Sequence, residues 1–374
     1  MYKKLVSVTL SILLLAMGVA SPRIIKSFDN LLERFNYIVS LDAPLTSHEE
    51  IKQTYNDGTL KSDLKFKTVS LTETQAKNLA HSITIEEDFI VKAETIDHNQ
   101  FLYNFIGEET ELYEEENINT SKTEGYTWNI PFVNGTEEDL STLGSQDIKV
   151  GVLDSGIAMG KEFENVYRVD LVPNTLQDSL GIHHDVTGHG TNAAGVIAAA
   201  KNEDGIIGIA PNVSLYSIRV LDEDNEAPIS RVIAGVEWAI ENDIDVLNMS
   251  FGTLNYSSLL YQSIRRAYDS GMVLVASAGN TGEDGDQVTY PAKFDEVISV
   301  GSCDQNGNMS AFSPESASVD ILAPGEYIEC VSLVDGYCTE YGTSLAAPHV
   351  TAAAALMRSA SLTPTSSPCW HRLP

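Results

Sequence analysis

The stretch YGTSLAAPHVTAAAALM, Tyr341–Met357, joins a glycine–threonine turn to an alanine-rich helix, with a serine at the junction. A purely structural helix needs neither the small residues around Ser344 nor the Pro-His pair that follows them. This arrangement predicts that another segment or molecule approaches the backbone closely at Ser344.

Upstream of this stretch, from Gln146, apolar segments alternate with helical segments. Such alternation indicates a parallel sheet with both faces covered. The expected strands are 148–154, 212–221, 245–251, 272–279 and 297–302, and the expected helices are 189–200, 229–242 and 257–271. Ligands of open parallel sheets bind at the carboxyl ends of the strands, so polar residues there are the first candidates for a site.

Three residues at such positions carry complementary chemistry. Asp154 ends the first strand in VGVLDSGI, His189 opens a helix in GHGTNAAGV, and Ser344 opens the last helix. A hydroxyl nucleophile needs a base, and an imidazole base needs a carboxylate to hold its tautomer. Taken singly, each residue has an ordinary structural role in a turn or a helix cap. Together, in glycine-flanked motifs, they favour a catalytic set.

The motifs VLDSGI, HGT..AG and GTS.AAPHV resemble those of the subtilisin-like serine proteases over about residues 125 to 360. The resemblance implies an α/β, three-layer catalytic domain built on a parallel sheet, acting as a monomer on peptides or proteins. It also implies that Asp154 orients His189, that His189 is general base and then general acid, and that Ser344 is the nucleophile. Catalysis of this kind needs no cofactor.

The same resemblance implies further site residues. Asn280, in VASAGNTG, matches the position whose amide stabilises the oxyanion, although an asparagine before Thr-Gly also suits a turn. The segment Ser250, Phe251 and Gly252 resembles the strand that pairs with extended substrate. Ala278 and Gly279 are assigned to substrate binding with it.

The N-terminal part predicts a signal peptide over residues 1–21, with a basic start and an apolar run, although an uncleaved anchor has a similar pattern. Residues 22–122 then resemble the inhibitory propeptide of the family, a small α+β, ferredoxin-like unit followed by an acidic linker. Its expected strands are NYIVSL, KFKTVSL and FIVKAE. We expect this propeptide to act as an intramolecular inhibitor and to be cut off near Lys122.

The peptidase domain is expected over residues 123–360. The Pro- and Ser-rich tail, residues 361–374, departs from the family and predicts an altered C-terminus. An inactive, truncated product is therefore an alternative to an active enzyme. An organofluorophosphate that labels Ser344 would separate the two.

The composition limits the classes of partner and the cellular location that we expect for the protein. The 374 residues include 53 acids and 23 Lys and Arg, for a formal net charge of −30, which argues against nucleic acid as a partner. With the signal peptide, the charge indicates a secreted, extracellular protein, and association with the cell surface is an alternative. Four cysteines form no disulfide framework, although Cys330 and Cys338 could close a local loop.

Calcium is the one cofactor that the resemblance suggests. The loop AAAKNEDGIIGIAP matches one that binds calcium in relatives, with Asn202 at the side-chain ligand position. Glu162 or Glu164 could add a carboxylate, since Ca²⁺ prefers oxygen ligands. An ordinary turn is the alternative.

The sequence also suggests a substrate. Its general form resembles the leader peptidases that release lantibiotics from their precursors, with a general degradative protease as the alternative. The acids of the loop after Asn280, Glu283, Asp284 and Asp286, could favour a basic residue before the scissile bond, because carboxylates hold an arginine by two hydrogen bonds. They could equally be a solvated loop in an acidic protein.

Overall fold

A computed structural model describes residues 34–40, 66–72, 76–77, 85–94, 96, 125, 127–134, 147–163, 166–172, 185–282, 285–333 and 336–360. The chain divides into two compact units, residues 1–89 and 90–374. The signal peptide, the acidic linker and the tail after residue 360 lie outside the described residues.

The first unit contains an antiparallel sheet with strand order β2-β1-β3. Its strands are β1 (Arg34–Ser40), β2 (Phe66–Thr72) and β3 (Ile85–Glu87). The first two strands pair along their whole length, from Arg34 opposite Thr72 to Ser40 opposite Phe66. The expected strands NYIVSL and KFKTVSL therefore correspond to β1 and β2.

The second unit is built on a seven-stranded sheet in the order β13-β12-β11-β9-β5-β7-β6, in which every pair is parallel. Five of its strands were expected from the sequence: β5 (Lys149–Asp154), β7 (Ser214–Arg219), β9 (Val246–Met249), β11 (Val273–Ser277) and β12 (Ile298–Cys303). The edge strands β6 (Val166–Asp170) and β13 (Ile321–Pro324) were not. Edge strands are less completely buried, so their apolar signal is weaker.

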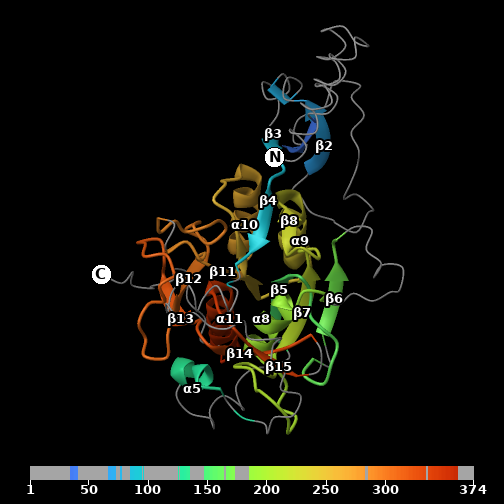
Figure 1. The fold of residues 1–374 in the computed structure, drawn as a ribbon. Coiled ribbons are helices and arrows are strands. Elements are labelled where there is room, and N and C mark those ends of the chain that lie inside the picture. Colours follow the sequence, from blue (N-terminus) through green and yellow to red (C-terminus); the bar gives the residue numbers. More distant parts are fainter. Residues whose placement is uncertain are drawn as a thin grey trace, which may run out of the picture. The chain divides into compact units, whose positions relative to one another are not determined.

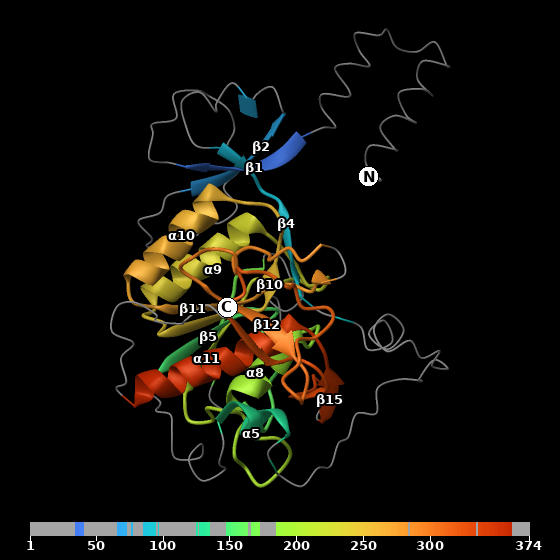
Figure 2. The ribbon, with the colours of Figure 1, turned by 90° about the vertical axis from the view of Figure 1, so that its left-hand side faces the viewer.

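Helices cover both faces of this sheet, as Figure 2 shows, with α9 and α10 on one face and α8 and α11 on the other. Their bounds are α8 (His189–Ala198), α9 (Ile229–Glu241), α10 (Ser258–Asp269) and α11 (Thr343–Ser359). The short α5 (Asn129–Asn134) and the hairpin of β14 (Ile328–Val331) and β15 (Tyr337–Glu340) complete the unit. The expected α/β, three-layer architecture is thereby confirmed.

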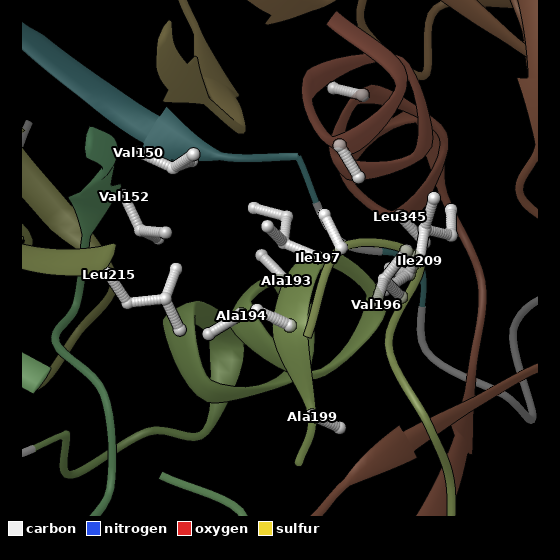
Figure 3. Packing of buried hydrophobic residues seen from close by; sticks show 14 of the residues in the cluster. Val150, Val152, Ala193, Ala194, Val196, Ile197, Ala199, Ile209, Leu215 and Leu345 are labelled. Carbon is white, nitrogen blue, oxygen red and sulfur yellow. The ribbon is translucent and has the colours of Figure 1, made fainter. Parts of the chain in front are cut away.

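The main core lies between the sheet and the α8–α11 layer. Val150, Val152 and Leu215 point from the strands toward Ala193 and Ile197 of α8 (Figure 3). These side chains are nearly or fully excluded from solvent. Small alanines on the helix let it approach the sheet closely, which brings the starts of α8 and α11 near the ends of the strands.

One expected strand is placed differently from the prediction. FIVKAE was expected to be the third strand of the small N-terminal unit, but β4 (Ile90–Ala93) belongs to a separate sheet of the second unit, in the order β10-β4-β8 (Figure 1). Its partners are β8 (Glu226–Pro228) and β10 (Phe251–Gly252), both antiparallel to it. Period and composition identify a strand but do not say which sheet it joins.

Cys330 and Cys338 are opposed residues in the β14–β15 hairpin, and with Cys303 they are free thiols. The local loop suggested by the sequence is therefore closed by strand pairing, without a disulfide. Among the described residues, no helix has the length and apolar character needed to cross a lipid bilayer.

Candidate active site

Asp154 and His189 meet at the end of β5. Nδ1 of His189 lies 2.7 Å from Oδ1 of Asp154, and both side chains are almost completely buried. The backbone N–H of Ser155 donates to the same carboxylate oxygen at 2.7 Å. The carboxylate thus fixes the tautomer with hydrogen on Nδ1, which leaves Nε2 as the basic nitrogen.

Close packing at the start of α8 positions this imidazole. A Cβ on Gly190 would lie 2.2 Å from the carbonyl oxygen of Gly156 and 3.1 Å from Cβ of Asp154, so only glycine allows the helix to start there. The preceding residue, Gly188, has a φ of 93°. Gly190 is therefore required by the contact between the helix and β5, and Gly188 is favoured by its left-handed backbone conformation.

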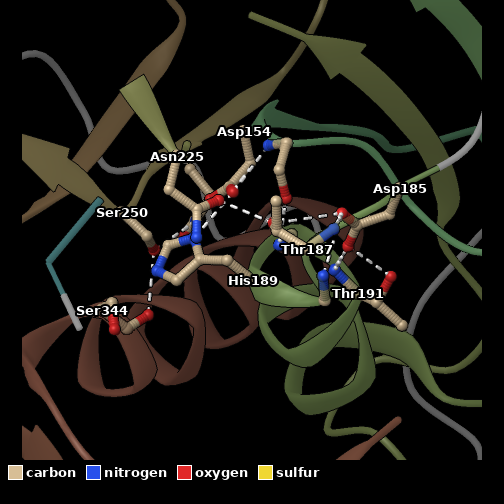
Figure 4. A network of polar contacts seen from close by, with 12 residues as sticks. Asp154, Asp185, Thr187, His189, Thr191, Asn225, Ser250 and Ser344 are labelled. Atoms are coloured by element: carbon tan, nitrogen blue, oxygen red, sulfur yellow. Dashed lines mark hydrogen bonds and ion pairs between the residues drawn. The ribbon is translucent and has the colours of Figure 1, made fainter. Parts of the chain in front are cut away.

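Asp185 caps this helix, a role that the sequence analysis missed. Its carboxylate accepts hydrogen bonds from the backbone N–H of Thr187 (3.0 Å), Gly188 (3.1 Å) and Thr191 (3.0 Å), and from the Thr191 hydroxyl (2.7 Å). Figure 4 shows this network beside His189. An aspartate shortly before a helix start is a typical cap signal, and DVTGHGT carries it.

The environment of His189 favours its charged form. Burial by itself lowers the pKa of His189, but the charge and hydrogen bond of Asp154, followed by the charge of Asp185, outweigh it, so the pKa is raised above its usual value. A raised pKa makes the imidazole a stronger base toward a hydroxyl proton.

Ser344 is the second residue of α11, and Asn280 follows β11. Oδ1 of Asn280 accepts hydrogen bonds from both the backbone N–H and the hydroxyl of Thr343, each at 3.0 Å. These two contacts orient the amide so that its Nδ2 is available to another group. The structure thus brings Asn280 beside the helix start that carries Ser344.

Buried polar atoms of this site lack hydrogen-bond partners among the described residues. They include Oδ2 of Asp154, Nε2 of His189, Oγ of Ser344 and Nδ2 of Asn280. Figure 4 shows His189 between Asp154 and Ser344. Leaving a buried polar atom unpaired is costly, so a cluster of such atoms indicates groups reserved for a reacting substrate.

A chain of buried hydrogen bonds ties α11 to the sheet. The Thr351 hydroxyl donates to Oδ1 of Asn248 (2.9 Å), Nδ2 of Asn248 donates to Oγ of Ser250 (2.9 Å), and Ser250 donates to the carbonyl oxygen of Ser344 (2.9 Å). Asn248 was missed, although a lone asparagine inside the apolar run DVLNMSF signals a buried polar contact. Ser250 therefore supports the nucleophile helix as well as the substrate strand.

Strand β4 and the residues after it occupy the cleft beside this site. Phe251 pairs with Ala93 and Gly252 with Lys92, and the backbone N–H of Glu94 donates to the carbonyl oxygen of Ser250 at 3.2 Å. Beyond the site, Ile96 forms an antiparallel bridge with Tyr341. Residues 90–94 are thus bound as an added strand.

The carbonyl oxygen of Glu94 and two polar atoms of the site surround a common point. A Cβ on Gly342, which has a φ of 131°, would lie 2.9 Å from the carbonyl oxygen of Glu94, 3.1 Å from Oγ of Ser344 and 3.3 Å from Nδ2 of Asn280. All three atoms therefore surround one point. Any side chain at position 342 would displace these atoms. This explains why the residue before Thr343 and Ser344 is glycine.

The side chain of Glu94 enters a pocket formed by Gly252, Gly279 and Thr289, called the S1 pocket below. Its Oε1 lies 3.2 Å from the Thr289 hydroxyl, which donates to it. A Cβ on Gly252 would lie 2.3 Å from that oxygen, and one on Gly279 3.7 Å. Ala278 contributes its carbonyl oxygen, which accepts the backbone N–H of Thr289 at 3.0 Å. Of these, Thr289 was not expected from the sequence.

In the described part of the acidic loop after Asn280, no carboxylate contributes to the S1 pocket. Asp286 is exposed, and it accepts a hydrogen bond from the backbone N–H of Glu315 at 3.0 Å. Glu283 and Asp284 lie outside the described residues. Since the pocket holds a carboxylate, the hypothesis that this loop selects a basic residue receives no support.

The residues proposed for calcium come together only in part. Nδ2 of Asn202 donates toward Oε2 of Glu162 (3.4 Å), while Oε1 of Glu162 accepts the Tyr337 hydroxyl (2.6 Å). Oδ1 of Asn202 accepts the backbone N–H of Asp204 at 3.1 Å. Within the described part of the chain, no group of three or more His, Cys, Asp or Glu could hold a metal, and Glu164 lies outside it. The oxygens of Asn202 and Glu162 already accept hydrogen bonds, so a Ca²⁺ ion would have to displace these donors.

Comparisons with known proteins agree with this geometry. A model described as the subtilase family matches residues 145–368. Subtilisin DY from Bacillus licheniformis is 39% identical over 249 residues, which are 66% of this chain and 89% of that protein. A thermostable alkaline protease from Halalkalibacterium halodurans is 36% identical over 245 residues, 66% of each chain. Subtilisin E from Bacillus subtilis is 39% identical over 230 residues, 61% of this chain and 59% of subtilisin E.

Proposed function

The chain belongs to the subtilase family of serine endopeptidases, and from this premise we propose that it is a precursor that cuts itself between Glu94 and Thr95. The observation that carries the proposal is that the Glu94 carbonyl oxygen, Oγ of Ser344 and Nδ2 of Asn280 all lie within 2.9 to 3.3 Å of the point where a Cβ on Gly342 would stand. This cut lies upstream of the one expected near Lys122. In this proposal the residues before Thr95 form the inhibitory propeptide.

The proposed reaction follows from the arrangement of the side chains. Oγ of Ser344 attacks the carbonyl carbon of Glu94, and its proton passes to Nε2 of His189. Asp154, 2.7 Å from the other ring nitrogen, stabilises the imidazolium that forms. The carbonyl oxygen becomes an oxyanion, which Nδ2 of Asn280 stabilises by a hydrogen bond.

The intermediate then collapses. The carbon–nitrogen bond between Glu94 and Thr95 breaks as His189 gives its proton to the Thr95 nitrogen, and Glu94 remains as an ester of Ser344. A water molecule attacks this ester, its proton passes to His189, and that proton returns to Oγ of Ser344. Glu94 is released with a free carboxylate, and the side chains of Ser344 and His189 return to their starting states.

Replacement of the nucleophile tests the proposal. When expressed without other proteases, the chain should yield a product that begins at Thr95, while Ser344→Ala should accumulate as uncut precursor. N-terminal sequencing and intact mass report both outcomes. Ser270→Ala is a matched control, because that hydroxyl donates to the carbonyl of Ala267 at the end of α10. Normal maturation of Ser344→Ala would contradict self-processing, and a product beginning only near residue 122 would contradict the site.

Release of a lantibiotic from its leader is the narrower form of this proposal. The cleft binds an extended segment by strand pairing on both sides, with β8 and β10, which suits a peptide leader better than a folded protein. A leader peptidase should cut a protein digest at few sites, whereas a general degradative protease should cut at many. Mass spectrometry of casein after incubation with the processed enzyme would distinguish them.

Secretion and a structural calcium ion stay predictions. The basic and apolar residues 1–21 support export, and recovery of the product from the culture medium would test it. Calcium would require Asn202 to turn its amide oxygen toward the ion. An unchanged melting temperature after chelation with EDTA would contradict calcium binding.

A further inference from the structure

The segment bound in the cleft places two of its side chains in the protein and leaves others in solvent. Val91 is completely buried, whereas Ile90 is 43% exposed. The side chain of Lys92 is 68% exposed, and it forms an ion pair with Glu226 that stabilises little at such exposure. Recognition by this cleft therefore depends on the residues at positions 91 and 94.

The S1 pocket offers hydrogen-bond donors to the side chain at position 94. The Thr289 hydroxyl donates to Oε1 of Glu94 at 3.2 Å, and the backbone N–H of Asn280 faces the same carboxyl group and lowers its pKa. A hydrogen bond to an ionised acceptor is about twice as strong as a neutral one. Among the described residues that form the pocket, Gly252, Gly279 and Thr289, none carries a negative charge to hold a lysine or arginine.

The carboxylate of Glu94 packs closely against the backbone. The carboxylate lies against Gly252, where a Cβ would come within 2.3 Å of its Oε1, so a bulkier end group would collide with the backbone there. Burial raises the pKa of Glu94 to about 7, although the hydrogen bonds of Thr289 and Asn280 act in the opposite direction. The carboxyl group has thus left water and depends on these donors.

We propose that Thr289 makes the S1 pocket selective for glutamate, and that substrates carry an aliphatic residue three positions before it. This inference rests on the proposed self-processing, and it assigns the same chemistry to separate substrates. The enzyme cuts peptides of the form Val-x-x-Glu after the glutamate. Thr289 is a specificity-determining residue, because it touches the substrate side chain but no reacting atom.

Peptides and the processed full chain test the proposal. The peptides have the sequence Val-Lys-Ala-X-Thr-Ile, with Glu, Lys or Leu at X, and kcat/KM is measured for each. The glutamate peptide should be cut at least roughly tenfold faster than the other two, in line with the cost of leaving buried donors unpaired. Equal or faster cutting of the lysine or leucine peptide would overturn the proposal.

Variants of the pocket test the contribution of the Thr289 hydroxyl to selectivity separately from that of the rest of the loop. Thr289→Val should reduce the ratio of kcat/KM for the glutamate and leucine peptides by roughly tenfold, whereas Thr289→Ser should keep it. Thr281→Val is the matched control, since its hydroxyl donates to the carbonyl of Gln287 in the same loop at 2.6 Å. An unchanged ratio in Thr289→Val would overturn the assignment of Thr289.

Labelling of Ser344 by an organofluorophosphate distinguishes the two proposals. A chain that is labelled and cuts itself, but prefers leucine or lysine peptides, overturns the selectivity and leaves the proposed function intact. A chain that is neither labelled nor able to cut any peptide overturns both.

Discussion

Two buried histidines of this protein have opposite electrostatic environments. His189 has the carboxylate of Asp154 on Nδ1 and an unpartnered Nε2, and its pKa is raised. His349, in α11, donates from Nδ1 to the carbonyl of Leu345 (2.7 Å) and accepts from the amide of Asn129 (2.8 Å) on Nε2. Burial lowers its pKa to about 4.

The contrast shows what makes a buried imidazole reactive. Both rings are excluded from water, so burial alone does not distinguish them. A carboxylate partner and one unpaired nitrogen produce a base at His189, whereas two neutral partners produce a structural link between α5 and α11 at His349. The following predictions test this difference, from the largest effect to the smallest.

Asp154→Asn should remove most of the difference in reactivity between His189 and His349. The amide can neither stabilise an imidazolium nor hold the tautomer, so kcat on a peptide substrate should fall about ten thousandfold. Circular dichroism should confirm that the variant is folded. A loss of less than tenfold would contradict the role of Asp154.

Asn280→Ala tests whether the unpaired atoms beside His189 serve the reaction. Loss of Nδ2 should lower kcat about 100- to 1000-fold and change KM little, because the oxyanion exists only in the transition state. Asn242→Ala is a matched control, since its amide donates to the carbonyl of Trp238 at the end of α9. A change confined to KM would contradict the assignment.

The pH dependence of stability should report His349. Its pKa is about 4 in the folded protein and about 6.5 when unfolded, so the unfolded chain binds the proton first as pH falls. The contribution of neutral His349 is complete above pH 6.5 and is lost toward pH 4, by on the order of 3 kcal/mol. The free energy of unfolding in urea is measured between about pH 4 and pH 7 for Ser344→Ala and for the double variant that also carries His349→Gln. The pH-dependent difference between them gives the contribution of His349. Identical pH profiles would contradict it.

Asp185→Asn should have the smallest effect. Loss of its charge lowers the pKa of His189, so the acidic limb of kcat/KM should move to lower pH. The weaker cap of α8 should cost about 1 kcal/mol of unfolding free energy. Asp269→Asn, an exposed change on α10, should do neither. A shift of the acidic limb of kcat/KM to higher pH would contradict the effect of Asp185 on the pKa of His189.

Much of the fold could be predicted from the sequence, because local patterns carry it. Apolar runs such as that of β9 indicate buried strands, and glycine-flanked polar residues identified Asp154, His189 and Ser344 as a set. Asp185 also left a local signal, as an aspartate shortly before a helix start, but the stronger motif around His189 hid it.

What could not be predicted depends on contacts between distant residues. Val-Lys-Ala-Glu reads as an ordinary strand, and no local feature shows that Glu94 meets Thr289, which is 195 residues away. Likewise, His349 and Asn129 are 220 residues apart, and neither motif reveals the other. A hydrogen bond between two such residues appears only when the chain is folded.

The sequence by itself determined the family and the parallel α/β sheet, and it predicted the catalytic set, since each depends on spacing within short motifs. Only the tertiary structure decided which sheet β4 joins, which carbonyl lies beside Ser344 and which side chain enters the S1 pocket. The physical reason is that a strand's unpaired N–H and C=O groups can pair with any edge. The choice of edge depends on side-chain fit in the folded protein.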